Sequence, residues 1–173
     1  MEAILTLAQQ QANKKISEKN SDRFNQLREE CIYKELTEML GASLINAIIA
    51  NPTETRFVDI LEAKEFEGLD GYNRKHAGLR NILSYLIYAR YIGESDVNDT
   101  FTGLVRKNRT ESESLSDGRI RLLQNDARDI AVSKFALIKE YLTINSATYP
   151  EWKCGVDRKQ FKPNFTTLRK TLR

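Results

Sequence analysis

Histidine, cysteine and proline are scarce in this sequence. Its 173 residues include one histidine, two cysteines and three prolines. Cys31 and Cys154 lie far apart and have no cysteine or histidine neighbour at ligand spacing, which predicts two free thiols in a reducing compartment and no zinc site. The sole histidine, His76, ends a basic turn before a helix, where we expect it to be solvated or to cap rather than to act as a general base.

Long hydrophobic runs and a secretory signal are also missing. No apolar run approaches the roughly 20 residues that a membrane helix requires. The opening residues, MEAILTLA, carry an acid where a signal peptide requires a base. The hydrophobic share of 40% and the charged share of 29% are typical of a globular domain made and retained in a cytoplasm. The net charge of +3 is too small to indicate a nucleic-acid-binding protein by itself.

The motifs of common enzymes are absent as well. The glycines between residues 68 and 78 lack the lysine and the preceding strand of a phosphate-binding loop. The acids between residues 62 and 70 fit no calcium loop, and a solvated helix surface is the expected explanation. Ser112 and Ser114 have no base beside them in the sequence. The sequence therefore predicts no enzyme and no cofactor, with a site built from scattered acids as a rival hypothesis.

Apolar residues recur at three- and four-residue intervals along most of the chain, which predicts helices. Asn51 and Glu54 suggest a capping box at the start of the third helix, which glycines end near residue 68, and Ser116 or Asp117 suggests a cap for the last one. The most apolar segment, 77–92, is expected to be the central helix. The predicted helices cover residues 24–40, 44–49, 51–67, 77–92 and 120–142.

The two ends of the chain differ from this helical body. Residues 1–20 begin with a short apolar patch and become polar, which predicts an N-terminal arm that is loosely held unless a partner covers it. Residues 155–173 form a basic tail with a single acid. The sequence thus predicts a mainly α protein, a small helical bundle over residues 21–154 with an inserted strand-and-loop arm at 97–115 and an extended C-terminal tail.

Helical periodicity breaks between the last two predicted helices, in the arm. Its β-branched residues and threonines favour an extended, half-buried backbone, and a basic cluster and a run of Ser and Glu follow. The arm is either an exposed hairpin or an edge that pairs with a neighbouring subunit. Its candidate contact residues are Phe101, Val105, Arg106, Lys107 and Arg109.

The C-terminal segment is either a disordered basic end or a segment that becomes ordered on a partner. Aromatic side chains are the usual anchors of interfaces, and basic ones would meet an acidic rim or nucleic acid. The candidate docking residues are Trp152, Phe161, Phe165, Lys159, Lys162, Arg169 and Lys170.

The order of these parts resembles the head–tail connector (adaptor, or ring) proteins of tailed bacteriophages, in the version seen in Bacteroidetes phages including the crAss-like group. The matching segments cover roughly residues 22–154, and GLVRKN followed by Ser and Glu residues is the most distinctive of them. They are EMLGASLINAI, AGLRNILSYLIYARYI, FTGLVRKNRTESESLS and the long helix that runs into TYPEWKC.

The resemblance implies a structural virion protein of the neck, made in the host cytoplasm and assembled as a ring, dodecameric in the family. Such a ring joins the portal of the capsid to the tail and extends the DNA channel, without catalysis, cofactor or membrane. The implied partners are other copies of the chain, the portal protein, downstream tail or ring proteins and the genomic DNA in the lumen. The resemblance also implies that the C-terminal segment reaches the portal and that the arm faces the next ring or the lumen. The alternatives are a small helical nucleic-acid-binding protein that uses the basic tail and an interaction module.

Overall fold

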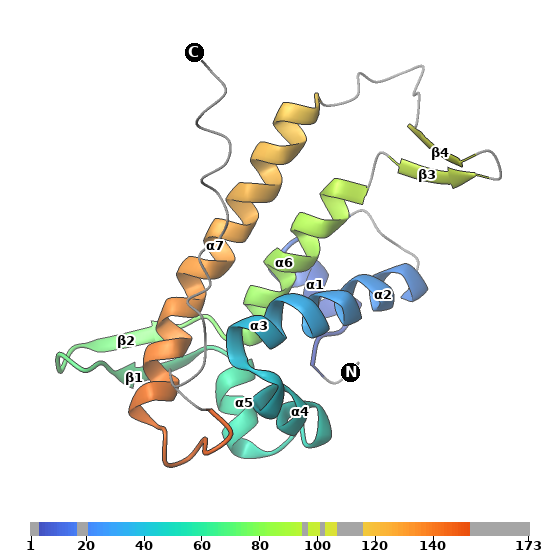
Figure 1. Ribbon diagram of the computed structural model, residues 1–173. Coiled ribbons are helices and arrows are strands. Elements are labelled where there is room, and N and C mark those ends of the chain that lie inside the picture. Colours follow the sequence, from blue (N-terminus) through green and yellow to red (C-terminus); the bar gives the residue numbers. More distant parts are fainter. Residues whose placement is uncertain (1–3, 17–20, 95–96, 101–102, 107–115, 153–173) are drawn as a thin grey trace.

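The computed structural model describes residues 4–16, 21–94, 97–100, 103–106 and 116–152 (Figure 1). These residues are mainly helical and include two separate antiparallel hairpins, so the predicted fold class is confirmed. Side chains are described for all of these residues except 97–100 and 103–106, for which only the backbone is described. The elements are α1 (Leu7–Asn13), α2 (Ser21–Cys31), η1 (Ile32–Leu36), α3 (Thr37–Leu40), α4 (Ala42–Ala50), α5 (Thr55–Leu61), β1 (Lys64–Glu67), β2 (Asn73–His76), α6 (Leu79–Glu94), β3 (Val97–Thr100), β4 (Gly103–Arg106) and α7 (Asp117–Ile144).

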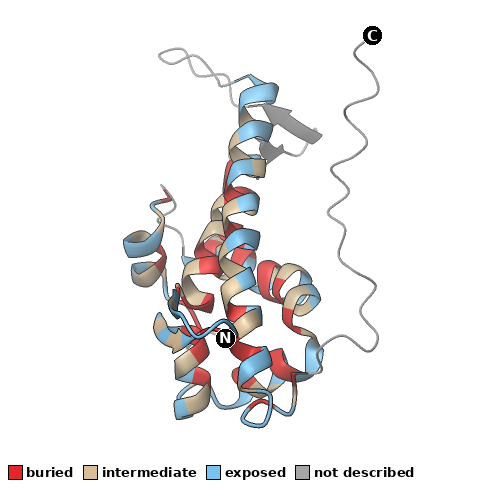
Figure 2. Ribbon diagram, turned by 90° about the vertical axis from the view of Figure 1, so that its left-hand side faces the viewer, coloured by how far each residue is buried: buried red, intermediate tan, exposed pale blue. Residues whose placement is uncertain are grey.

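Helices α6 and α7 lie side by side and form the centre of the body (Figure 1). Both were predicted, and Ser116 accepts a hydrogen bond from the backbone N–H of Arg119 as the cap of α7. Helix α7 extends past the end of α6, and its first turns are exposed whereas its later turns are buried (Figure 2). The core therefore lies around α6 and the second half of α7.

The segment from α2 to α3 runs as one helix that contains a wide turn, η1. Thr37 donates both its backbone N–H and its hydroxyl to the carbonyl of Ile32, five residues earlier. The extra residue in this turn allows Cys31, Ile32 and Leu36 all to be buried. Gly41, with φ of 88°, ends the helix as its position predicts.

Residues 51–76 differ from the prediction. Asn51 ends α4, and Glu54 precedes α5 without a side-chain capping bond, so no capping box forms there. Helix α5 ends at Leu61, and the acidic stretch after it is a β-hairpin, with Lys64 paired to His76. The glycines near residue 70 therefore form the turn of a hairpin rather than the end of a helix.

The connection from this hairpin to α6 requires glycine. Gly78 has φ of 80°, and a Cβ atom there would lie 2.5 Å from the carbonyl oxygen of Leu61. That position combines a left-handed backbone with a contact too close for any side chain. The end of α5 and the start of α6 are packed together at this point.

The N-terminal segment packs on the body of its own chain, which corrects the prediction of a loosely held arm for residues 4–16. Ile4 and Leu5 are buried, with 2% and 0% of their surface exposed. Arg28 donates to the carbonyl oxygen of Leu5 at 3.0 Å, and Arg80 donates to that of Ile4 at 2.7 Å. The short apolar patch is sufficient to hold this segment on the body, because two arginines also bind its backbone carbonyl groups.

Candidate functional site

The second hairpin, β3–β4, contains part of the predicted arm. Val97 pairs with Arg106 and Asn98 with Val105, so strand structure is confirmed for Val105 and Arg106, whereas Phe101, Lys107 and Arg109 lie outside the described residues. In the described part of the chain, the two strands pair only with each other. The hairpin stands beyond the end of α6 (Figure 1).

An isolated pair of strands has two consequences. Two strands alone are marginally stable in water, because they bury little apolar surface. Each strand also keeps an outer edge whose N–H and C=O groups are not used by another described strand, and such an edge can accept a strand from another chain. The hairpin is therefore a candidate contact element.

Trp152 lies in the hydrophobic core of its own chain, where 5% of its surface is exposed. The prediction that it is an exposed docking anchor is corrected, because its side chain is already buried by this chain. The other predicted docking residues lie outside the described residues. They are Phe161, Phe165, Lys159, Lys162, Arg169 and Lys170.

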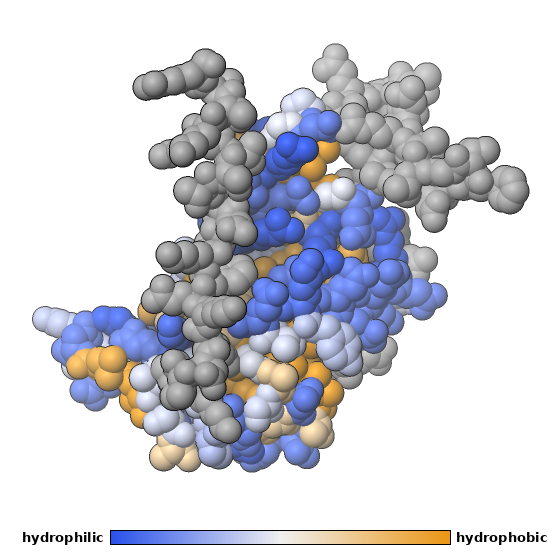
Figure 3. Space-filling model, in the orientation of Figure 1, coloured by the Kyte–Doolittle hydropathy of each residue, from blue (hydrophilic) through white to orange (hydrophobic). Residues whose placement is uncertain are grey.

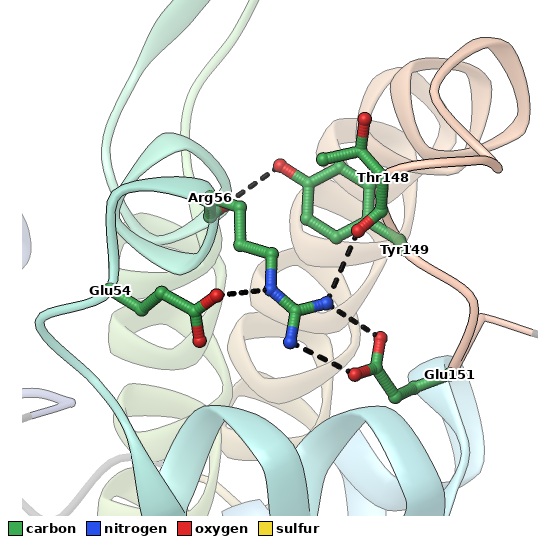
Figure 4. A network of polar contacts seen from close by, with 5 residues as sticks. All are labelled: Glu54, Arg56, Thr148, Tyr149 and Glu151. Atoms are coloured by element: carbon green, nitrogen blue, oxygen red, sulfur yellow. Dashed lines mark hydrogen bonds and ion pairs between the residues drawn. The ribbon is translucent and has the colours of Figure 1, made fainter.

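An arginine on α5 binds the segment that follows α7 (Figure 4). Two nitrogens of Arg56 donate to the two carboxylate oxygens of Glu151, at 2.9 and 3.0 Å. Arg56 also donates to Glu54 at 2.6 Å and to the carbonyl of Thr148 at 3.2 Å. The donated hydrogen bonds from Arg56 hold the pKa of Glu151 below its usual range. We call Arg56, Glu151 and Tyr149 the C-terminal clamp.

Tyr149 supplies the buried part of the clamp. Its hydroxyl donates to the carbonyl oxygen of Arg56 at 2.7 Å and lies 3.4 Å from the hydroxyl of Tyr141 on α7. The ring is 1% exposed, and this burial raises the pKa of the phenol. The clamp therefore fixes the chain as far as Trp152. Sequence reasoning missed it, since Arg56 lies 95 residues from Glu151.

His76 is fully buried, which corrects the expectation of a solvated or capping residue. Its ring centre lies 4.9 Å from that of Tyr141 and 5.9 Å from that of Phe66. The expected turn is in fact the strand β2, and the alternation of side chains along this strand points His76 inward. Burial, and then the charge of Lys64, lower its pKa. No serine or cysteine is among these neighbours, so the arrangement is not that of an activated nucleophile.

The turn of the β1–β2 hairpin holds two large apolar side chains in solvent. Leu69 is 76% exposed and Tyr72 is 72% exposed, and hydrophobic surface shows on this hairpin in Figure 3. Glu140 of α7 accepts from the backbone N–H of Leu69 at 3.2 Å and from Arg74 at 2.5 Å. Arg74 also pairs with Asp70, whose pKa is lowered, first by the backbone N–H of Tyr72 and then by Arg74. The turn is thus fixed to α7.

An open depression over α2, η1 and α3 is lined by side chains of both charges. Arg90 of α6 donates to Glu30 of α2 at 2.8 Å and to Glu35 of η1 at 2.9 Å, which joins α6 to the segment from α2 to α3. Burial raises the pKa of the neighbouring Cys31 thiol, so this thiol is a poor nucleophile. The depression is lined by Gln26, Glu29, Glu30, Tyr33, Lys34, Glu38 and Arg90.

Neither a metal site nor a membrane helix is found among the residues that the structure describes. No group of three or more His, Cys, Asp or Glu side chains in these ranges is placed to hold a metal ion. No helix in the same ranges is both long and apolar enough to cross a bilayer. The features that stand out are therefore the β3–β4 hairpin, the C-terminal clamp and the exposed turn of the β1–β2 hairpin.

Comparison with known proteins gives one match. A family model described as "Family of unknown function (DUF6712)" matches residues 36–162. This span begins at the end of η1, includes both hairpins, α6, α7 and the clamp, and continues past Trp152. No curated protein and no solved structure matches the chain.

Proposed function

We propose that this chain, which belongs to the family of unknown function DUF6712, is a structural virion protein. In this proposal it is the subunit of a ring that joins the portal of a capsid to the tail and extends the DNA channel. Its partners are other copies of itself, the portal protein and the downstream tail or ring proteins, with genomic DNA passing through the lumen. The role requires no catalysis and no cofactor.

The β3–β4 hairpin is the observation that carries the proposal. It pairs with no other described strand and lies beyond the end of α6 (Figure 1). A neighbouring copy that packed against it would bury the surface that two strands cannot bury alone. A contact between this hairpin and a different surface of the next copy is heterologous, and such contacts close into rings when the rotation between subunits permits.

The C-terminal clamp supports the same role. Arg56, Glu151 and Tyr149 fix the chain up to Trp152, so every copy holds Trp152 at the same place on its body. In a ring this places one basic, aromatic segment at each symmetry-related position. We propose that the segment docks on the portal or on a neighbouring subunit through Phe161, Phe165 and its lysines and arginines.

The proposal is tested by measuring particle mass. The 19.9 kDa chain, alone and mixed with the portal protein of the same virus, is examined by mass photometry and negative-stain electron microscopy. We expect a monomer or small oligomer alone and a closed ring with the portal protein. Val105→Pro should prevent ring formation, because it places proline in the β4 ladder.

Gly118→Ala is the matched control for this experiment, since a Cβ atom at residue 118 meets nothing within 4 Å. It should assemble like the natural chain. A ring that forms equally well with Val105→Pro, or absence of the chain from purified virions, would overturn the proposal. Retention of DNA by the isolated chain that falls steeply with salt, and that requires residues 155–173, would favour the nucleic-acid-binding alternative instead.

A further inference from the structure

His76 is a buried titratable group for which folding supplies no polar partner in the described part of the chain. None of its surface is exposed, and neither ring nitrogen has a hydrogen-bond partner among the described residues. Buried imidazoles are normally hydrogen-bonded, because an unpaired N–H or nitrogen lone pair loses its bonds to water. Burying the neutral imidazole costs only the hydrogen bonds that it loses to water. Burying an imidazolium would cost more, because it would leave two unpaired N–H groups and a charge.

The side chains around His76 come from four parts of the chain. Phe66 and Lys64 come from β1, Tyr141 from α7 and Asp59 from α5, and Tyr149 reaches Tyr141 from the segment after α7. We call these contacts the aromatic seam. They join the β1–β2 hairpin to the end of α7 and to the C-terminal clamp.

The charges in the seam oppose a second cation. The ammonium of Lys64 disfavours a positive charge on His76, whereas Asp59, which pairs with Lys64 at 2.5 Å, favours one. The hydroxyl of Tyr141 lies beside that of Tyr149, which in turn donates to a backbone carbonyl. No side chain of the seam is thus placed to receive an N–H from a protonated His76.

We propose that His76 is an acid-sensitive lock on this seam. The neutral ring closes the contact between the hairpin, α7 and the clamp, and its protonation opens that contact. Opening releases the segment that holds Tyr149 and Trp152, from which residues 153–173 continue. Helices α1 and α2 pack on α6 away from the seam and stay folded.

The direction of the effect follows from proton linkage. Burial and Lys64 lower the pKa of His76 below the ordinary histidine value of about 6.5. Below about pH 6.5 the open form therefore binds a proton that the closed form does not. The opening equilibrium then rises by up to about tenfold for each pH unit, until the lowered pKa of the closed form is reached. The pKa values of Glu151 and Asp70 are lowered instead, so both carboxylates stay ionised through this window and do not account for the expected change.

Hydrogen exchange measured by mass spectrometry between pH 7.5 and 5.0, corrected for intrinsic exchange rates, tests the lock. In the natural chain, exchange of residues 64–76 and 138–152 should rise by up to about tenfold per unit below pH 6.5, with α2 and α6 unchanged. His76→Phe and His76→Gln should both remove this dependence, although only Gln adds an unpaired amide. A pH-independent natural chain, or an equal rise in both variants, would exclude the lock.

A second measurement does not depend on how the variants fold. His76 is the only histidine of the chain, so its imidazole signals in a proton NMR spectrum need no assignment. We expect the signals of the closed form to keep the neutral shift below pH 6.5 and to lose intensity as the seam opens. A simple titration near pH 6.5 with unchanged exchange in residues 64–76 would show that the ring is protonated without opening, which contradicts the proposal.

Discussion

Arg56 and Glu151 meet through two parallel hydrogen bonds, although 95 residues separate them in the chain. Fork-to-fork pairing of a guanidinium with a carboxylate fixes both the distance and the relative orientation of the two groups. The pair therefore sets where the chain lies as it leaves the body. It is the most direct target for testing the C-terminal clamp.

Glu151→Gln should loosen the segment after α7 without unfolding the protein. The amide keeps one acceptor but loses the charge and the second acceptor that Arg56 uses. Hydrogen exchange of residues 145–152 at pH 7 should become several-fold faster, while exchange in α6 stays the same. Glu65→Gln is the matched control, because the Glu65–Lys75 pair is 3.6 Å apart and its side chains are 78% and 62% exposed.

The contribution of Glu151 should also depend on pH in a defined direction. Its pKa is lowered in the folded chain, so its stabilising effect is fully present above the unfolded glutamate value of about 4.3. That effect is lost as the pH falls through the lowered value. The difference in exchange between the natural chain and Glu151→Gln should therefore persist at pH 5 and disappear at strongly acidic pH. A difference that vanishes between pH 7 and 5 would contradict this assignment.

Gly78→Ala should destabilise the fold. The left-handed backbone at this residue costs a side chain about 1–2 kcal/mol, and the new Cβ atom would lie 2.5 Å from the carbonyl oxygen of Leu61. Urea unfolding should show a decrease in the free energy of unfolding of at least that size. Gly118→Ala, in the first turn of α7 with open space around it, should be neutral or stabilise by up to about 1 kcal/mol. Equal effects of the two substitutions would be inconsistent with the described backbone.

Trp152→Ala should cost about 3–5 kcal/mol of folding stability, because the natural side chain is 5% exposed in the core. If Trp152 were instead exposed for docking on a partner, its replacement by alanine would change the folding stability little. Trp152 is the only tryptophan, so its fluorescence reports on its own environment. In the natural chain the emission should shift to longer wavelength on urea unfolding, and an emission typical of exposed indole before urea is added would contradict the burial.

Leu5→Ala tests the packing of the N-terminal segment. Its side chain is fully buried in the core, and we expect a loss of about 2–5 kcal/mol in the free energy of unfolding. Leu69→Ala is the control, because it makes the same substitution at a leucine that is 76% exposed. Its effect on the free energy of unfolding should stay within about 0.5 kcal/mol. A loosely held arm would give small effects at both positions.

Much of the helical framework could be predicted, because the helical spacing of apolar residues and the capping residues can both be read from short stretches of sequence. Helix α7 begins after Ser116, as the sequence indicates, and spans the predicted segment 120–142 before it ends at Ile144. The β1–β2 hairpin could not be predicted in this way. Its strand Lys64–Glu67 contains one apolar residue among charged ones, and it becomes a strand because Phe66 packs against rings from β2 and α7.

Burial of the two misassigned residues has the same origin. His76 lies among charged neighbours in the sequence, and only the pairing of β2 with β1 turns it toward α7. Trp152 stands two residues after Pro150 and shortly before the basic tail, and its burial accompanies a clamp made by a distant arginine. In both cases one decisive partner, Tyr141 for His76 and Arg56 for the clamp, lies dozens of residues away, where local patterns carry no information.

Because α7 extends past α6, its first turns can act as a lever arm. At 1.5 Å per residue, 28 residues span about 42 Å. The later turns of this helix are held by the core, whereas its first turns are exposed (Figure 2). A tilt of about 5° about the held end would move the free end by roughly 4 Å, by the same helix geometry. A push on the exposed first turns of α7 would thus be transmitted, reduced in amplitude, to Tyr141 and the rings of Phe66 and His76 that it contacts.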